Sequence, residues 1–89
     1  MPDNLNPDAY AIQIYALRNF REKIDISNLD SFLVFKTYDG YFKYIFGQFS
    51  SEDAAGPDLN KTRNAGFKDA FVTRYRKFKG SKLFYKKVK

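Results

Sequence analysis

The most informative part of this chain is residues 39–75, which read DGYFKYIFGQFSSEDAAGPDLNKTRNAGFKDAFVTRY. In order, they contain a tight turn, a strand of alternating side chains, a helix with start and stop signals, and another strand. Asp39-Gly40 is a strong turn signal between aromatic-rich runs, so Phe32–Tyr38 and Tyr41–Phe46 are predicted to form a hairpin. Gly47 is predicted to end the second of these strands at a bulge.

The helix is predicted to begin at Ser50 or Ser51 and to run to about Asn64. A serine side chain caps the free N–H groups of a helix start, and the two acidic residues that follow favour the positive end of the helix dipole. Gly66 is predicted to stop the helix, because glycine adopts a left-handed backbone without strain. Pro57 lacks a backbone donor, so a kink or a late start is predicted near it.

Strands are also predicted on both sides of this central part. Tyr10–Ala16 alternates, and its even-numbered residues are predicted to face the core. Ala70–Tyr75 is predicted as a fourth strand, and Leu83–Val88 is a candidate for a fifth at a sheet edge, where its lysines would oppose aggregation. Residues 17–31 are less regular, and only one helical turn is predicted there.

This order of elements predicts the α+β class, with a split β-α-β arrangement as in ferredoxin-like and RNP-like folds. A four-stranded antiparallel sheet is expected to carry one main helix and a shortened first helical region on one face, leaving the other face open to solvent. Residues 1–8 are predicted as an N-terminal arm, residues 9–76 as the domain, and residues 77–89 as a basic C-terminal tail or an extra edge strand.

Composition narrows the function. The 89 residues include ten Phe and seven Tyr but no His, Cys or Trp. Without His and Cys, structural zinc sites, thiol nucleophiles and Ser-His-Asp triads are excluded. Glu52 and Asp53 are neighbours at the predicted helix start, which explains them better than a glycosidase carboxylate pair does. The sequence therefore predicts a binding domain that is not an enzyme, with no cofactor and no metal.

Charge is segregated along the chain. Residues 1–60 contain five Lys or Arg and nine Asp or Glu, whereas residues 61–89 contain eleven Lys or Arg and a single Asp. The basic segment Arg74–Lys89 predicts contact with an anionic partner such as nucleic acid, an anionic lipid surface or an acidic wall polymer. A solubilising tail would have the same composition, and this alternative stays open.

The sequence contains no targeting signal. No apolar run approaches the about 20 residues of a membrane span. Residues 1–8 are polar and acidic, unlike a signal peptide. The chain is thus expected to be either cytoplasmic or a mature or excised domain.

Several segments resemble the sporulation-related repeat (SPOR) family. Tyr10–Leu17, YAIQIYAL, is similar to the family's first strand, which reads aromatic-x-V-Q-[VI]-x-[AS]-[FY]. Residues 42–50, FKYIFGQFS, followed by Ala54-Ala55, are similar to its third strand and Ala-bearing helix. Residues 66–72, GFKDAFV, look most like the envelope-protein versions of Bacteroidetes. The resemblance covers residues 9–76.

The chain departs from that family at two positions, where Tyr15 replaces the usual Gly and Gln48 the usual Pro. Members bind bacterial peptidoglycan through the open face of the sheet, and favour glycan strands stripped of their stem peptides. The resemblance therefore implies a non-catalytic, monomeric glycan-binding module of the cell envelope or periplasm.

The resemblance also implies a set of glycan contacts: Gln13, Tyr41, Lys43 and Phe71, with Ala16 in the place of a small polar residue. Strand alternation independently selects the same face. The side chains predicted to point away from the helices, and to bind the glycan, are Gln13, Tyr15, Tyr41, Lys43, Ile45, Phe71 and Thr73. Aromatic rings cover the apolar patches of sugars, while Gln and Lys donate to their oxygens. Solvated positions and cross-strand pairs are the alternative explanation of these residues.

A single-stranded nucleic-acid binder is the leading alternative function, because RNA-recognition modules use the same architecture and stack bases on sheet aromatics. Tyr15, Tyr41 and Phe71 would stack the bases, beside the basic segment Arg74–Lys89. The glycine-aromatic signature of those modules is absent from residues 41–46. A protein-interaction domain that has lost glycan binding is a third possibility.

Overall fold

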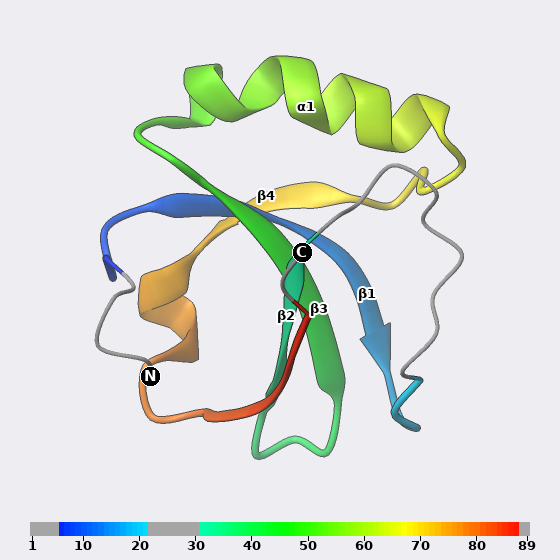
Figure 1. Cartoon of the computed structure of the whole chain (residues 1–89), viewed down its shortest axis with the longest axis vertical. Coiled ribbons are helices and arrows are strands. Elements are labelled where there is room, and N and C mark those ends of the chain that lie inside the picture. The colour runs from blue at the N-terminus through cyan, green and yellow to red at the C-terminus, as the bar shows by residue number, and fades with distance from the viewer. Residues whose placement is uncertain (1–5, 22–30, 88–89) are drawn as a thin grey trace.

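The computed structural model describes residues 6–21 and 31–87, which form a five-stranded sheet with one α-helix (Figure 1). The strands lie in the order β4-β1-β3-β2-β5, and every pairing is antiparallel. The elements are β1 (Tyr10–Leu17), β2 (Phe32–Lys36), β3 (Phe42–Phe49), α1 (Glu52–Asn64), β4 (Phe71–Arg74), the short 3₁₀ helix η1 (Tyr75–Phe78) and β5 (Lys82–Lys87). The α+β class is confirmed, and the sheet has five strands because the C-terminal segment pairs with β2 at the edge.

The β2–β3 hairpin closes at the predicted turn. The Thr37 amide donates to the Tyr41 carbonyl at 3.1 Å, and the Gly40 amide donates to the Thr37 carbonyl at 3.0 Å. Gly40 has a φ of +89°, a left-handed conformation that suits glycine. The Asp39 carboxylate accepts from the Tyr41 amide and from the Thr37 hydroxyl, and so holds the turn together.

Helix α1 has the predicted start and stop. The Ser51 hydroxyl accepts from a backbone amide of the first turn at 3.0 Å, and Gly66, with a φ of +114°, follows the last turn. The helix runs through Pro57 from its start after Ser51, so the predicted late start is wrong. Ala55 is fully buried and Leu59 packs on the core. This tertiary packing on both sides of the proline outweighs its local cost to the helix.

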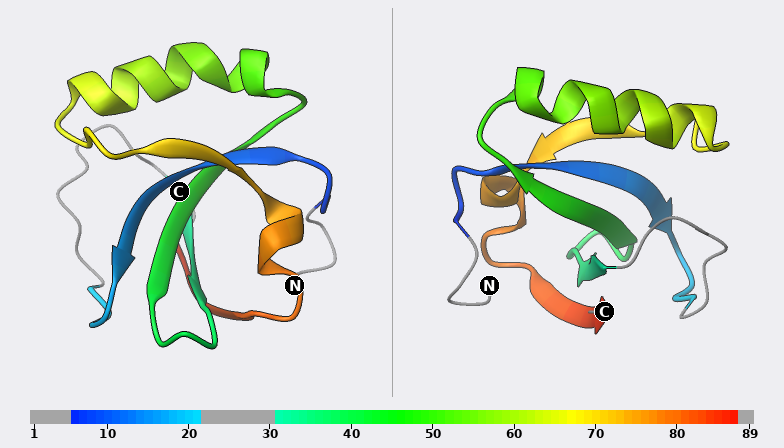
Figure 2. Two further views of the ribbon diagram at one scale, coloured as in Figure 1. Left: turned by 180° about the vertical axis from the view of Figure 1, so that it is seen from behind. Right: turned by 45° about the horizontal axis from the view of Figure 1, so that its top comes forward.

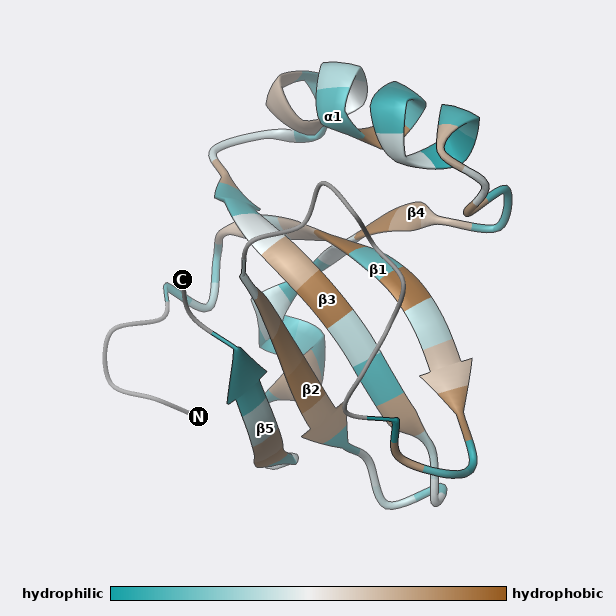
Figure 3. Ribbon diagram, turned by 45° about the vertical axis from the view of Figure 1, so that its right-hand side comes forward, coloured by the Kyte–Doolittle hydropathy of each residue, from teal (hydrophilic) through white to brown (hydrophobic). Residues whose placement is uncertain are grey.

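The face of the sheet that α1 covers, here the α1 face, carries an apolar core. Figure 3 shows hydrophobic stretches along β1, β2 and β3, the strands that supply most of this core. Ile12 and Tyr44 are fully buried there, and Leu59 of α1 packs against them. The Tyr44 hydroxyl accepts from the Arg21 amide at 2.6 Å and donates to the Arg21 carbonyl at 2.8 Å. Tyr44 therefore ties the chain after β1 to this face. Most of the segment predicted to hold a helical turn, residues 22–30, lies outside the described residues.

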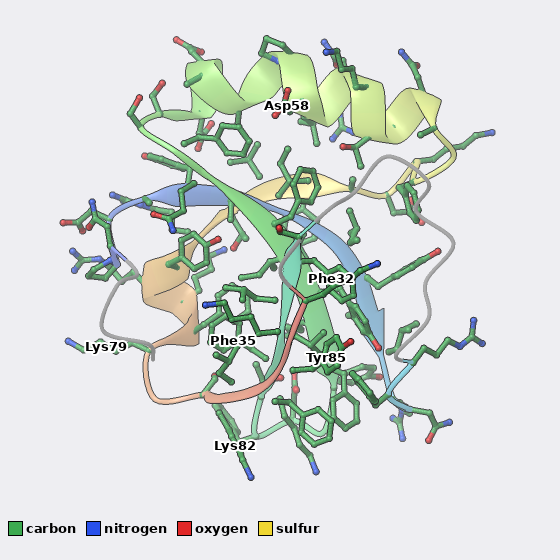
Figure 4. The ribbon with its side chains drawn as sticks, in the orientation of Figure 1. Phe32, Phe35, Asp58, Lys79, Lys82 and Tyr85 are labelled. Carbon is green, nitrogen blue, oxygen red and sulfur yellow. The ribbon has the colours of Figure 1, made fainter. Side chains whose placement is uncertain are left out.

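The opposite face, here the η1 face, is partly covered by η1, which lies across the strands from α1 (Figure 2). Tyr75 and Phe78 are buried in a second core there. Phe78 stacks on Phe35 of β2 with ring centroids 5.0 Å apart (Figure 4). The prediction that this face is open to solvent is wrong for this part, because the fourth strand ends at Arg74 and the chain then turns over the sheet.

The 3₁₀ helix η1 packs against a bulge of β3 at Gly47. Gly47 has a φ of +85°, and its carbonyl accepts from the Tyr75 hydroxyl. The register of β1 and β3 shifts at this point, as predicted for a bulge, but β3 continues to Phe49 and does not end at the glycine. Burial raises the pKa of Tyr75 to about 12.

A second bulge reverses the side chains of the last part of β1. Gln13 pairs with Ile45, but the next paired residue of β1 is Tyr15, which lies opposite Tyr44. One extra residue in a strand moves all later side chains to the other face. Tyr15 therefore packs edge-on against Tyr44 and Phe67, with ring centroids 6.0 and 5.3 Å away. The prediction that Tyr15 points away from the helix is wrong.

Candidate functional site

Strand pairing brings most of the predicted site residues onto the η1 face. Phe71 pairs with Gln13 across β4 and β1, and Gln13 pairs with Ile45 across β1 and β3. Lys43 lies two residues before Ile45 on the same face and pairs with Ala16. Residues distant in sequence thus meet across three neighbouring strands.

Three predicted residues, Tyr41, Lys43 and Phe71, remain accessible beside the part that η1 covers, and Gln13 lies nearly buried among them. We call these four residues the strip: Gln13, Tyr41, Lys43 and Phe71. The Phe71 side chain is well exposed, Tyr41 is half-buried, and the Lys43 side chain is 27% exposed. Gln13 lies between strands at the centre of the strip and keeps 9% exposure. An extended ligand on this face would meet an aromatic ring, an amide, a cation and a second ring in turn.

Two other predicted residues are buried beneath or beside η1. Ile45 has no exposed surface and packs with Phe35 and Phe78 in the second core. Thr73 is 3% exposed and pairs with Ala11 of β1, next to the same core. Neither side chain can touch a ligand while η1 is in place. Alternation correctly assigned both residues to this face but says nothing of what covers it.

Arg18 is a functional candidate that the sequence reasoning missed. Its guanidinium carbon lies 5.3 Å from the centre of the Tyr41 ring, and its Nε donates to the Tyr41 hydroxyl at 3.3 Å. The hydrogen bond raises the pKa of Arg18, which stays a permanent cation. As an even-numbered residue after β1, Arg18 would continue the predicted core face. The β1 bulge is what brings it to the η1 face.

Asp39 sets the electrostatics at the hairpin end of the strip. Its carboxylate lies 3.5 Å from the Lys43 ammonium. Hydrogen bonds from the Thr37 hydroxyl and the Tyr41 amide, together with Lys43, lower the pKa of Asp39. Asp39 is thus ionised at neutral pH and offsets part of the Lys43 charge. Arg18 has no carboxylate within ion-pair distance among the described residues, so this end of the strip is net positive.

Within the described residues, some cations of the predicted basic segment Arg74–Lys89 have partners in the chain, and others do not. The Arg74 guanidinium lies 4.7 Å from the centre of the Tyr10 ring, and Arg76 forms an ion pair with Asp8, which lowers the pKa of Asp8. Lys79 and Lys82 extend outward from the loop before β5 and from its start (Figure 4). The described lysines of this segment form a basic rim along η1 and β5: Lys77, Lys79, Lys82, Lys86 and Lys87. Residues 88 and 89 lie outside the described residues.

Two kinds of site find no support in the described part of the chain. Within residues 6–21 and 31–87, the acidic side chains form no group of three that would hold a metal ion. The helix found there is too short and too polar to cross a membrane.

Comparison of the chain with protein-family models, with curated proteins and with solved structures found no match.

Proposed function

We propose that this chain is a non-catalytic module that binds glycan strands of bacterial peptidoglycan through the strip. One observation carries the proposal. The four residues selected by both strand alternation and the family resemblance, Gln13, Tyr41, Lys43 and Phe71, lie on one part of one sheet face, where the last three are accessible and Gln13 is nearly buried among them. The cell envelope is the compartment that this function requires.

The chemistry of the strip suits a sugar chain. Phe71 and Tyr41 lie at its two ends and offer rings to the apolar patches of pyranose units. Gln13 between them offers both a donor and an acceptor, and Lys43 offers a donor to hydroxyl or acetamido oxygens. Because the strip crosses strands β4, β1 and β3, an extended ligand would lie across the strands and meet all four side chains.

The strand order also supports the finer fold assignment that we propose, the split β-α-β arrangement. In that arrangement, the first and second strands flank the third, and the fourth pairs with the first. The order β4-β1-β3-β2 agrees with it, and β5 extends the sheet beyond β2. Phe20, just after β1, packs on Phe42 and Tyr85 of the α1 face, where the first helix of such a fold would lie.

Single-stranded nucleic acid is the second candidate ligand. The Arg18–Tyr41 pair and the basic rim favour it, because stacking and phosphate neutralisation are the two parts of such binding. The position of Tyr15 counts against it. Tyr15 is turned into the α1 face, which leaves Tyr41 and Phe71 as the stacking platform.

The test is co-sedimentation of the chain with purified sacculi, before and after partial removal of stem peptides by an amidase, at 50 and 300 mM salt. We expect retention that survives the higher salt and increases after amidase treatment. Phe71→Ala should weaken retention about three- to tenfold, which is the loss of affinity expected when one stacked ring is removed. Nucleic-acid binding would instead fall steeply over the same salt range.

Phe84→Ala is the matched control for this experiment. Phe84 on β5 is 43% exposed, against 42% for Phe71, but it packs with Phe20 and Phe42 on the α1 face. Its loss should leave retention unchanged. Equal losses from both variants, or retention seen only at low salt, would contradict glycan binding through the strip.

A further inference from the structure

Arg18 carries hydrogen-bonding capacity that the fold does not use. Its Nε donates to Tyr41, whereas its two terminal amino groups make no hydrogen bond to any residue within 6–21 and 31–87. The cation–π contact with the Tyr41 ring and the hydrogen bond to its hydroxyl hold the guanidinium beside Tyr41, and Arg18 as a whole is exposed. An arginine held in this way loses less freedom on binding than a free surface arginine does.

Lys43 stands next to this guanidinium. Lys43 pairs with Ala16, and Arg18 follows Ala16 by two residues and lies over Tyr41, two residues before Lys43. Arg18 follows the last paired residue of β1, and both cations thus lie near Tyr41, with Arg18 at its ring and Lys43 two residues along the chain. Asp39 already contacts the Lys43 ammonium, so Arg18 is the cation with unmatched charge.

We propose that Arg18, assisted by Lys43, binds a sugar carboxylate of the glycan, namely the lactyl carboxylate of a muramic acid unit. This inference rests on the proposed function. The carboxylate is free only where the stem peptide has been cleaved from the sugar; in intact peptidoglycan it forms an amide bond and has no charge. Arginine presents two parallel donors that match the two oxygens of a carboxylate. The pair would therefore distinguish stripped glycan strands from strands that still carry peptides.

The experiment measures binding of the full chain to labelled glycan strands by fluorescence anisotropy at 100 mM salt. One glycan sample is stripped by amidase and keeps its lactyl carboxylates. A second portion of the same sample is coupled to methylamine with a carbodiimide, which converts those carboxylates to neutral amides. We expect the Kd to be at least tenfold lower for the carboxylate form, the value of one charge-assisted hydrogen-bonded pair.

Variants distinguish the specific role of Arg18 from the effect of positive charge in general. Arg18→Gln should raise the Kd for the carboxylate form far more than the Kd for the amidated form, and so remove most of the preference. Arg18→Lys should keep part of the preference, because it retains the charge but not the two parallel donors. Lys61→Gln on α1, at the opposite side of the sheet, removes one positive charge and should change neither affinity. Arg18 is exposed, and thermal unfolding will verify that its variants are folded.

The outcomes distinguish the inference from the function on which it rests. Equal binding of both glycan forms by the unmodified chain would overturn the carboxylate assignment and leave glycan binding standing. Equal weakening of both forms by Arg18→Gln would also overturn it. Binding to neither form would overturn the proposed function and the inference together.

Discussion

Two tyrosine hydroxyls join covering segments to the sheet at the scale of single residues. Tyr75 donates to the Gly47 carbonyl and fastens η1, while Tyr44 bonds to both backbone groups of Arg21 and fastens the chain after β1. Burial raises the pKa of both phenols, and for Tyr44 the hydrogen bond from Arg21 offsets part of this effect. Each phenol therefore stabilises the fold in its neutral form.

Tyr75→Phe should lower the free energy of unfolding by about 1–2 kcal/mol at pH 7, because the Gly47 carbonyl loses its buried donor. The pKa of Tyr75 is raised from 10.0 to about 12, so the stabilisation by its neutral form is complete below pH 10 and is lost as the pH rises from there to about 12. Urea unfolding from pH 8 to 11.5 should thus show a smaller alkaline loss in Tyr75→Phe than in the unmodified chain. Tyr38→Phe is the control, since Tyr38 is fully exposed. If both variants lost the same stability with pH, the buried phenol would not be the cause.

At the scale of secondary-structure elements, two bulges determine which side chains lie on the η1 face and where η1 packs. The bulge after Gln13 turns Tyr15 into the core and brings Ala16 and Arg18 to the η1 face. The bulge at Gly47 lets β3 bend and present a carbonyl to η1. The composition of the strip thus depends on the β1 bulge, and its boundary depends on the one in β3.

Gly47→Ala should destabilise the chain by about 1–3 kcal/mol. A side chain at a φ of +85° is strained, and its Cβ would lie 2.4 Å from a ring carbon of Phe49, which must move. Gly80→Ala is the control, because Gly80 has nearly the same φ, +88°, but open space around its Cβ. It should cost only the backbone strain, about 1 kcal/mol. Urea unfolding compares the two losses, and a Gly47→Ala variant that loses no more stability than Gly80→Ala would contradict the role of the bulge.

At the scale of the whole molecule, two kinds of surface lie in different places. The strip, with Arg18 beside it, combines rings, an amide and two cations on the η1 face, whereas the basic rim follows η1 and β5. Acidic residues of the helix, Glu52, Asp53 and Asp58, lie on the other side of the sheet with α1. We infer that the rim supplies long-range attraction to an anionic polymer, and that the strip supplies the specific contacts.

Replacing Lys79 and Lys82 by Gln tests this separation. Affinity for a single-stranded DNA oligonucleotide at 50 mM salt, taken as a general polyanion, should fall severalfold, because each lysine contributes to counterion release. Retention on sacculi at 300 mM salt should stay the same, since neither lysine belongs to the strip. Unchanged DNA affinity would mean that the rim does not attract polyanions, and lost retention would mean that it is part of the glycan site.

Local sequence signals were sufficient to place the strands and α1, but not η1. The Asp39-Gly40 turn, the Ser51 cap and the Gly66 stop satisfy the backbone within a few residues, so they act in the same way whatever surrounds them. Alternation likewise assigned Gln13 and Phe71 to one face, because a regular strand has a fixed period of two.

Only the tertiary structure decided which of those side chains are accessible. Tyr15 and Arg18 changed faces through a bulge that depends on pairing with β3, a strand some thirty residues away along the chain. Ile45 and Thr73 are buried because η1 folds back over them, driven by the burial of Tyr75 and Phe78. Both effects are long-range, since the free energy comes from contacts between segments that carry no local mark of each other. The sequence by itself thus determines the strands and α1, and tertiary packing determines the faces beyond the bulges and the accessible part of the candidate site.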